Sequence, residues 1–226
     1  MTSPDPSRVL TWTADPAAGE ERFEQVLVRG GGAGLRARGT ILVGAGELTE
    51  ADGPFRVDYE LDTVADWVTH RLVVRAAGAD WRRELWLRRD ADGRWSCRRV
   101  AEPGDPRPAV PAPAVLADAV DCDLVSSALF NMMPIARSGL HRRPGRQDFL
   151  MAWVSIPYLA VTPSRQTYGH VRPGVVSFAS AGGFTAEVEV DDDGYPRRYP
   201  LVALRVPEAT SATLGSSTRQ PAGEGA

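Results

Sequence analysis

Apolar and polar residues alternate along much of this chain, and this pattern limits the folds open to it more than any other feature. In residues 55–61 the odd positions are apolar and the even positions are charged, and residues 184–190 show the same division with the parity exchanged. A period of two is typical of a β-strand with one buried face and one solvated face. Both segments are therefore predicted to be strands with one wet face.

Further segments have strand composition, and short turn sequences such as Asp92-Gly93 and Asp193-Gly194 separate some of them. The segments are residues 23–29, 35–43, 67–76, 81–89, 94–100, 148–156, 166–171, 175–180 and 195–205. Parallel strands need crossover connections of about a dozen residues, for which we find no room. We therefore predict a mainly β protein with a large antiparallel sheet and little helix.

The chain has 226 residues, which suits one large all-β domain. We place that domain at residues 9–206, between a disordered N-terminus at 1–8 and a disordered C-terminal tail at 207–226. Residues 103–113 hold five prolines and are predicted to form an excursion from the sheet, because proline lacks an amide donor.

The net charge and the two cysteines argue against several classes of function. The net charge of −3 provides no attraction to phosphate backbones, so nucleic acid is not predicted as a partner. Cys97 and Cys122 match no metal-ligand spacing, and we expect neither a metal nor a cofactor. No stretch is apolar enough to span a membrane, and residues 1–8 lack the apolar region of a secretion signal. A cytoplasmic location is predicted.

Residues 121–137 combine two acids, an Asn and a final Arg with large apolar side chains, a mixture that is typical of a lined cleft. Asp121 and Asp123 are two apart, so a strand would place both carboxylates on one face, about 7 Å apart. They could bind a cation or the hydroxyls of a headgroup. The alternative is an edge strand with solvated acids or Asx caps.

Aromatic and cationic residues of the predicted strands give a second candidate surface. Trp86 alternates with charged residues, so its ring is exposed, paired across strands or turned into a lumen. Arg71 shares a face with Trp67, which could form an aromatic wall with a cationic anchor. Structural packing is the default interpretation for most of the tryptophans in predicted strands, which include Trp95.

Four separated pieces of sequence, in a fixed order, resemble the putative glycolipid-binding family of bacterial domains over roughly residues 10–205. They are Tyr59-Glu-Leu with Asp66-Trp67 and Arg71; Gly93-Arg-Trp95; Asp121-x-Asp-Leu with Asn131 and Pro134-Ile135-x-Arg137; and Gln166-x-Tyr168 with Val190-Asp191-x-x-Gly194 and Tyr199-Pro200. The resemblance implies a curved antiparallel half-barrel, similar to envelope lipoprotein carrier proteins, around a hydrophobic cavity.

The chain departs from the family's pattern at several positions. Ser127 and Ala128 stand where the family usually has Thr-Pro, Met132 replaces Thr, Met133 replaces Leu, and Ala136 replaces a first Arg. One arginine and one hydroxyl are thereby lost near the predicted site.

These observations lead to one hypothesis and two alternatives. The hypothesis is a non-catalytic binding or carrier protein that encloses a small amphiphile, such as a glycolipid or a fatty acid derivative, in a hydrophobic cavity. The alternatives are an enzyme that uses Asp121 or Asp123 with Arg137 as an anion anchor, and a structural β domain without a ligand. The predicted ligand-binding residues are Trp67, Arg71, Trp86, Trp95, Asp121, Asp123, Asn131, Met133, Arg137 and Tyr168.

Overall fold

The computed structural model describes residues 7–31, 33–44, 46, 53–101 and 113–207. Within them the protein is mostly β, with one large, curved and unclosed sheet and a single short α-helix. The strands follow the order β7-β6-β5-β4-β3-β2-β1-β14-β13-β12-β11-β10-β9-β8. The predicted fold class is confirmed.

The first half of the sheet consists of β1 (Ser7–Ala14), β2 (Arg22–Gly31), β3 (Gly34–Val43), β4 (Phe55–Thr63), β5 (Thr69–Ala77), β6 (Arg82–Arg89) and β7 (Trp95–Ala101). Each strand pairs antiparallel with the next through a meander. Short 3-10 helices lie at η1 (Pro16–Ala18), between β1 and β2, and at η3 (Ala65–Trp67), between β4 and β5.

The second half begins with η4 (Pro113–Leu116) and β8 (Asp121–Leu124). It continues through η5 (Leu129–Asn131), α1 (Met132–Ser138), β9 (Arg146–Val154), β10 (Val161–Arg172), β11 (Val175–Ser180), β12 (Thr185–Val190), β13 (Pro196–Tyr199) and β14 (Ala203–Arg205). β14 pairs with β1 and so joins the two halves into one sheet.

One pairing differs from the prediction. β8 and β9 are parallel, with Asp121 opposite Met151 and Asp123 opposite Trp153. The crossover that joins them, residues 125–145, contains η5 and α1, and it is the helical connection for which we found no room in the sequence. The expectation of a purely antiparallel meander is wrong at this edge.

Strand boundaries follow the alternation closely, with a few exceptions. The 67–76 segment begins as a strand only at Thr69, because Asp66 and Trp67 have positive φ and form a turn. The 195–205 segment is split between β13 and β14. β1 was not predicted, and it includes Ser7 and Arg8, which we assigned to the disordered N-terminus.

Two predicted irregular segments fall largely outside the described residues. Of the proline-rich excursion at 103–113, only Pro113 is described, at the start of η4. Of the tail at 207–226, only Pro207 is described.

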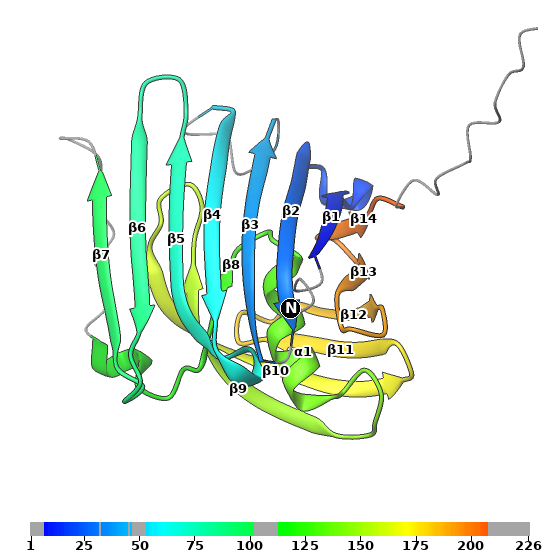
Figure 1. Cartoon of the computed structure of the whole chain (residues 1–226). Helices are drawn as coiled ribbons and strands as arrows, with labels where there is room; N and C mark the ends of the chain where they lie inside the picture. Colours follow the sequence, from blue (N-terminus) through cyan, green and yellow to red (C-terminus); the bar gives the residue numbers. More distant parts are fainter. Residues whose placement is uncertain (1–6, 32, 45, 47–52, 102–112, 208–226) are drawn as a thin grey trace, which may run out of the picture.

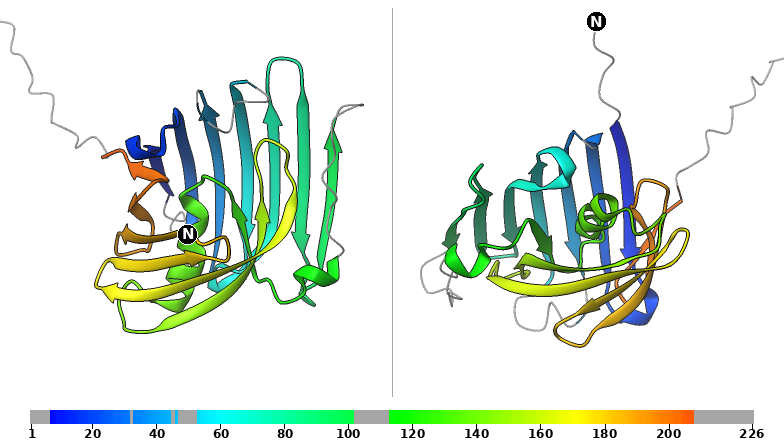
Figure 2. Two further views of the ribbon diagram at one scale, coloured as in Figure 1. Left: turned by 180° about the vertical axis from the view of Figure 1, so that it is seen from behind. Right: turned by 90° about the horizontal axis from the view of Figure 1, so that it is seen from below.

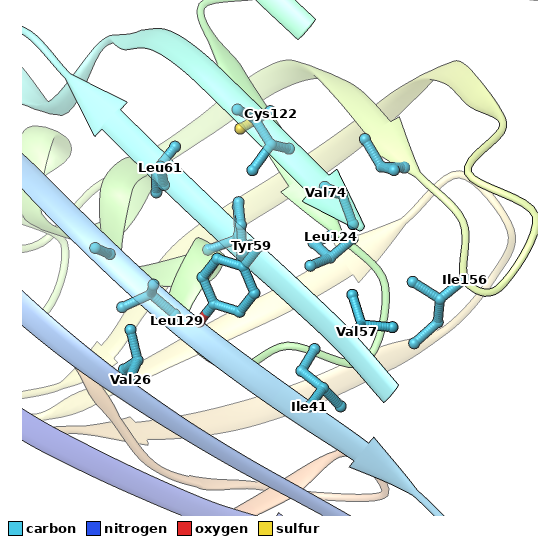
Figure 3. Packing of buried hydrophobic residues seen from close by; sticks show 14 of the residues in the cluster. Val26, Ile41, Val57, Tyr59, Leu61, Val74, Cys122, Leu124, Leu129 and Ile156 are labelled. Atoms are coloured by element: carbon cyan, nitrogen blue, oxygen red, sulfur yellow. The ribbon is translucent and has the colours of Figure 1, made fainter. Parts of the chain in front are cut away.

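The larger hydrophobic core lies on the concave side of the first half of the sheet. Inward side chains of β2 to β5, among them Ile41 and Val57, pack against Leu124 and Leu129 from the 121–137 segment (Figure 3). Leu124, Leu129, Phe130 and Met133 are at most 1% exposed. Figures 1 and 2 show α1 lying inside the curve of the sheet.

This packing corrects the expectation of an empty apolar hollow. On this part of the concave side the space is filled by the protein's own side chains, and the apolar residues of 121–137 fill it. They are core because close packing of apolar surface is more favourable than leaving it against water.

Candidate functional site

A cleft of about 410 Å³ lies where the 121–137 segment meets the second half of the sheet. Its lining combines polar groups with aromatic and aliphatic side chains. The polar side chains are those of Glu20, Arg22, Asp123, Ser126, Ser127, Asn131, Ser164, Gln166 and Ser180, and the larger apolar ones are those of Leu124, Val125, Trp153, Phe178, Phe184, Tyr199, Leu201 and Val202.

Asp123 reaches this cleft because alternation along β8 separates its two faces. Cys122 and Leu124 join the large core, and Asp123 lies on the other side of the strand. The Nε2 atom of Gln166 donates to Oδ2 of Asp123 at 2.6 Å. Burial raises the pKa of Asp123 to about 6, against the effect of the hydrogen bond from Gln166.

Tyr168 fixes the orientation of Gln166. Its hydroxyl donates to Oε1 of Gln166 at 2.9 Å, so the amide nitrogen must face Asp123. Tyr168 is fully buried, with its ring against those of Phe149 and Phe178. The three polar residues form a chain of hydrogen bonds that ends at the Asp123 carboxylate.

Asn131 has an unusual combination of burial and missing partners. Its residue is 4% exposed, and its Oδ1 atom has no hydrogen-bond partner among the described residues. It is the N-cap residue of α1, a position where Asn commonly accepts a bond from the first turn, yet its side chain makes no cap bond. A buried acceptor without a donor costs about 1–3 kcal/mol.

Arg22 braces the wall of the cleft. Its guanidinium donates to the carbonyl of Ser126, to the carbonyl of Val202 at 2.5 Å and to Glu20 at 3.3 Å. Ser126 and Leu201 both line the cleft with positive φ, 66° and 63°. Such backbone is costly for residues other than glycine and persists only where the surroundings enforce it.

Glu24 lies behind this wall and was missed by the sequence analysis. It is fully buried and accepts from Tyr59 Oη at 2.7 Å, from the Ser127 hydroxyl, and from the Ala128 amide at 3.0 Å. Burial raises its pKa above the ordinary value. The sequence contains a sign of this, because Glu24 has the parity of the inward Val26 in β2. A charged residue on an otherwise apolar face is seldom buried without a bonding partner.

Ser127 departs from the family pattern but keeps a side-chain hydroxyl. It bonds Glu24 where the family usually has a threonine hydroxyl. Met132, where a hydroxyl is lost, is 1% exposed and packs in the core, and Ala136 packs against the same core.

Asp121 and Arg137 form a second polar contact near the cleft. Both guanidinium Nη atoms of Arg137 donate to the Asp121 carboxylate, one of them at 2.8 Å. Asp121 is fully buried, and burial raises its pKa while Arg137 opposes the rise. The pair anchors α1 to β8, so the guanidinium that the enzyme alternative assigns to an anion is already bonded to Asp121.

Aromatic rings form one side of the cleft. Phe178 lies 5.7 Å from Tyr199 and 6.0 Å from Phe184, measured between ring centroids. Trp153 is half-buried and stands opposite Asp123 in the β8–β9 register. The cleft therefore offers flat apolar surface close to a carboxylate.

The structure separates the ten predicted site residues into four places. Asp123 and Asn131 line the cleft, and Asp121, Arg137 and Tyr168 support it from nearby. Trp95 and Met133 belong to the large core, with Trp67 packed against it, and Trp95 Nε1 donates to the Ala119 carbonyl at 2.9 Å.

Arg71 and Trp86 face away from the core, on the outer side of the sheet. Arg71 pairs with Asp62 at 2.9 Å and Glu60 at 3.2 Å, and the Arg98 guanidinium lies 3.5 Å from the Trp86 ring centroid. The predicted wall of Trp67 with Arg71 does not form, because Trp67 lies in the η3 turn instead of on the strand.

Among the described residues, no group of three or more His, Cys, Asp or Glu side chains is arranged to hold a metal ion. The helices in this part of the chain are all too short or too polar to cross a bilayer.

Comparisons with known proteins agree with this architecture. Residues 9–205 match the family described as "Putative glycolipid-binding". A crystal structure of a DUF1089 family protein from Pseudomonas aeruginosa is similar with a TM-score of 0.62 and 20% identity, over 91% of this chain and 95% of that chain. A search of curated proteins gave no match. Because the family match spans nearly all of the described fold, cleft included, the chain belongs to the "Putative glycolipid-binding" family.

Proposed function

We propose that the protein is a non-catalytic binding or carrier protein for a lipid-like amphiphile such as a glycolipid, and that it holds the polar end of that ligand in the cleft. The observation that carries the proposal is the composition of the cleft, where Asp123, Asn131 and Gln166 converge beside Trp153 and Phe178. An apolar pocket with a few convergent polar groups is the general form of a small-molecule site. The family description supports a binding role.

The cleft suits the polar end of an amphiphile better than its whole apolar tail, because of where the protein leaves space. The apolar core beneath the first half of the sheet is filled, whereas the cleft of about 410 Å³ falls within the range of about 300–1,000 Å³ for ligand pockets. Leu201 lines the cleft and is 52% exposed, so it offers contact to the start of an alkyl chain.

Native mass spectrometry of protein purified from its own host, with extraction of bound lipids, tests the proposal. Thermal unfolding against a panel of lipids and glycolipids complements it, because a ligand at 100 times its Kd stabilises the folded state by about 2.7 kcal/mol. We expect a bound amphiphile and a rise in Tm with at least one class in the panel.

Two tryptophan variants locate the binding. Trp153→Ala is expected to abolish the ligand-induced rise in Tm, whereas Trp86→Ala is the matched control, because Trp86 lies on the outer face beneath Arg98. A protein that is always empty and unchanged in Tm across the panel would contradict the proposal, and so would equal loss of the rise in both variants.

A second candidate is an enzyme, which the raised pKa of Asp123 favours. A buried carboxyl with a pKa of about 6 in a cleft can act as a general acid or base near neutral pH. Mass spectrometry of alkyl glycosides and acyl esters incubated with the protein tests this role. Turnover that disappears in Asp123→Asn would establish it, and unchanged compounds would rule it out for those classes.

A further inference from the structure

We propose that the outer face of the first half of the sheet docks on an anionic lipid bilayer, through arginines and exposed apolar side chains. This face lies on the side of β1 to β7 that points away from the large core, so the inference goes beyond the proposed function and does not depend on the cleft. It follows from the charge of the outward positions, from arginines that lack acidic partners, and from the apolar residues beside them.

The outward positions carry an excess of positive charge. They are the odd-numbered residues of β1, β2 and β5 and the even-numbered residues of β3, β4, β6 and β7, which alternate with the core positions. Nine arginines and four acids occupy them, a formal charge of +5, although the whole chain carries −3. The net charge of the chain therefore conceals a face that attracts anions.

The arginines of β2 and β3 have no acidic partner. Arg36 stands opposite Asp62 in the register, and Arg38 stands opposite Glu60, but both acids bond instead to an arginine of β5. Arg29 of β2 stands opposite Arg36, and none of these three arginines forms an ion pair with another described residue. Like charges directly opposite one another destabilise a sheet, and an anion that binds between them offsets the repulsion.

Apolar side chains are exposed on the same face. Phe23 stands opposite Leu42, and the two residues are 39% and 49% exposed. Val9 is 52% exposed and stands opposite Leu27, which in turn stands opposite Arg38. Exposed apolar and cationic side chains are thus neighbours. This combination is typical of surfaces that bind a membrane interface, where anionic lipids attract the cations and apolar side chains enter between the headgroups.

The apolar side chains favour a bilayer over nucleic acid. Most protein contacts to nucleic acid are hydrogen bonds to phosphate and sugar, which arginines can supply but which leave Phe23 and Leu42 without a partner. An anionic bilayer accepts both kinds of side chain, because its headgroups carry the charge and its acyl chains lie beneath them. The strands of this face lie side by side over a broad surface (Figure 1), which suits contact with an extended bilayer.

Flotation of the full chain with lipid vesicles tests the inference. One set of vesicles contains phosphatidylcholine alone, and in the other about one third of the lipid is phosphatidylglycerol. We expect at least tenfold tighter binding to the anionic vesicles, which weakens as added salt screens the charges. Similar binding to both sets, or binding to neither, would overturn the inference. Equally tight binding to double-stranded DNA would also overturn it, because the face would then recognise any polyanion.

Trp153→Ala separates this docking from binding in the cleft. Trp153 lines the cleft and lies outside the docking face, so this variant is expected to bind anionic vesicles as the wild type does. Loss of vesicle binding in Trp153→Ala would show that the cleft holds the lipid, and the inference would fail while the proposed function stands. If the wild type binds no vesicles, the proposed function is likewise unaffected, because its test uses changes in Tm without vesicles.

A matched pair of double variants tests the arginines. Arg36→Gln with Arg38→Gln removes two unpaired charges from β3 and is expected to weaken binding to anionic vesicles about tenfold. Arg165→Gln with Arg172→Gln removes the same charge from two exposed positions of β10, in the second half of the sheet, and is expected to change binding little. Equal losses in both would show that only the net charge matters, and the inference would fail.

A second matched pair tests the apolar side chains. Phe23→Ser with Leu42→Ser is expected to weaken binding about fivefold, since these side chains no longer enter the interface. Val115→Ser with Val171→Ser is the control, because these residues are 49% and 42% exposed in η4 and β10. Tm of each variant checks that the fold is intact. Wild-type binding by the folded Phe23→Ser and Leu42→Ser protein would contradict apolar insertion and overturn the inference.

Discussion

The carboxyl of Asp123 is less stable in its ionised form inside the folded protein than in the unfolded chain, and this has a measurable consequence. Burial raises its pKa from 3.8 to about 6. Below pH 3.8 both states hold the proton, and the group contributes nothing. As the pH rises through 3.8 the unfolded chain loses the proton first, so the folded state is progressively penalised until the pH exceeds about 6.

The variant Asp123→Asn removes this penalty and keeps an oxygen for the Gln166 amide. We expect the unfolding free energy of the variant to rise above that of the wild type between pH 4 and pH 7, by up to about 3 kcal/mol. Urea denaturation across that pH range measures the difference in unfolding free energy between the two proteins. The titration of Glu24 does not contribute to this difference, because both proteins contain Glu24. Parallel pH curves for the two proteins would show that Asp123 titrates near its ordinary value.

Close contacts between single residues explain why the Glu24 network could not be read fully from the sequence. A Cβ atom at Gly39 would lie 2.2 Å from the Tyr59 ring, so this glycine makes room for the ring whose hydroxyl reaches Glu24. Glu24 shares the parity of the inward Val26 in β2, but parity says nothing of the groups that it meets. Its partners Tyr59 and Ser127 come from distant segments, and only folding brings them together.

At the scale of elements, the ion pair between Arg137 and Asp121 holds α1 against β8. Arg137→Met would leave Asp121 as a buried carboxylate without a partner, and we expect a loss of about 3–5 kcal/mol of stability at neutral pH. The loss should shrink in acid, where the carboxyl can take up a proton. Chemical denaturation at two pH values measures both effects.

Two companion variants test the origin of that loss. Adding Asp121→Asn to Arg137→Met is expected to restore part of the stability, because the buried charge is then gone. Arg56→Met breaks an exposed pair with Asp58 and is expected to change the stability little, because solvent screens that pair. Equal costs for Arg137→Met and Arg56→Met would show that the Asp121 pair does not anchor the helix.

The elements divide into those that periodicity predicts and those that it does not. Strands with one wet face, such as β4 and β12, follow directly from alternation. β8 is buried along its whole length, so all four of its residues lack the contrast between wet and dry faces on which alternation depends. The parallel pairing of β8 with β9 likewise depends on α1, a helix of one or two turns whose residues also suit a cavity lining.

At the scale of the molecule, the strands of the described residues form one sheet whose halves meet at β1, and we therefore expect the protein to unfold as one unit. β1 pairs with β2 on one side and β14 on the other, and Nε1 of the fully buried Trp12 donates to the Pro196 carbonyl of β13 at 2.8 Å. Trp12→Phe should cost about 1–3 kcal/mol, because that carbonyl loses its donor.

Far-ultraviolet circular dichroism and tryptophan fluorescence, followed through the same denaturation, test this cooperativity. Coincident transitions are expected for the wild type and for Trp12→Phe, with the midpoint lowered only in the variant. Trp86→Phe, on the outer face, serves as the control. Two separate transitions in the wild type would show that the halves fold as independent units.

The sequence by itself determined the class of the fold and most of the strands, because alternation and turn chemistry act between neighbours along the chain. It also identified Asp123 and Asn131 as site candidates. The tertiary structure alone decided that the apolar residues of this segment fill the concave side, that Arg137 belongs to Asp121, and that Arg71 and Trp86 lie on the outer face. Those outcomes depend on which surfaces meet when the sheet curves, and a local pattern does not specify distant contacts.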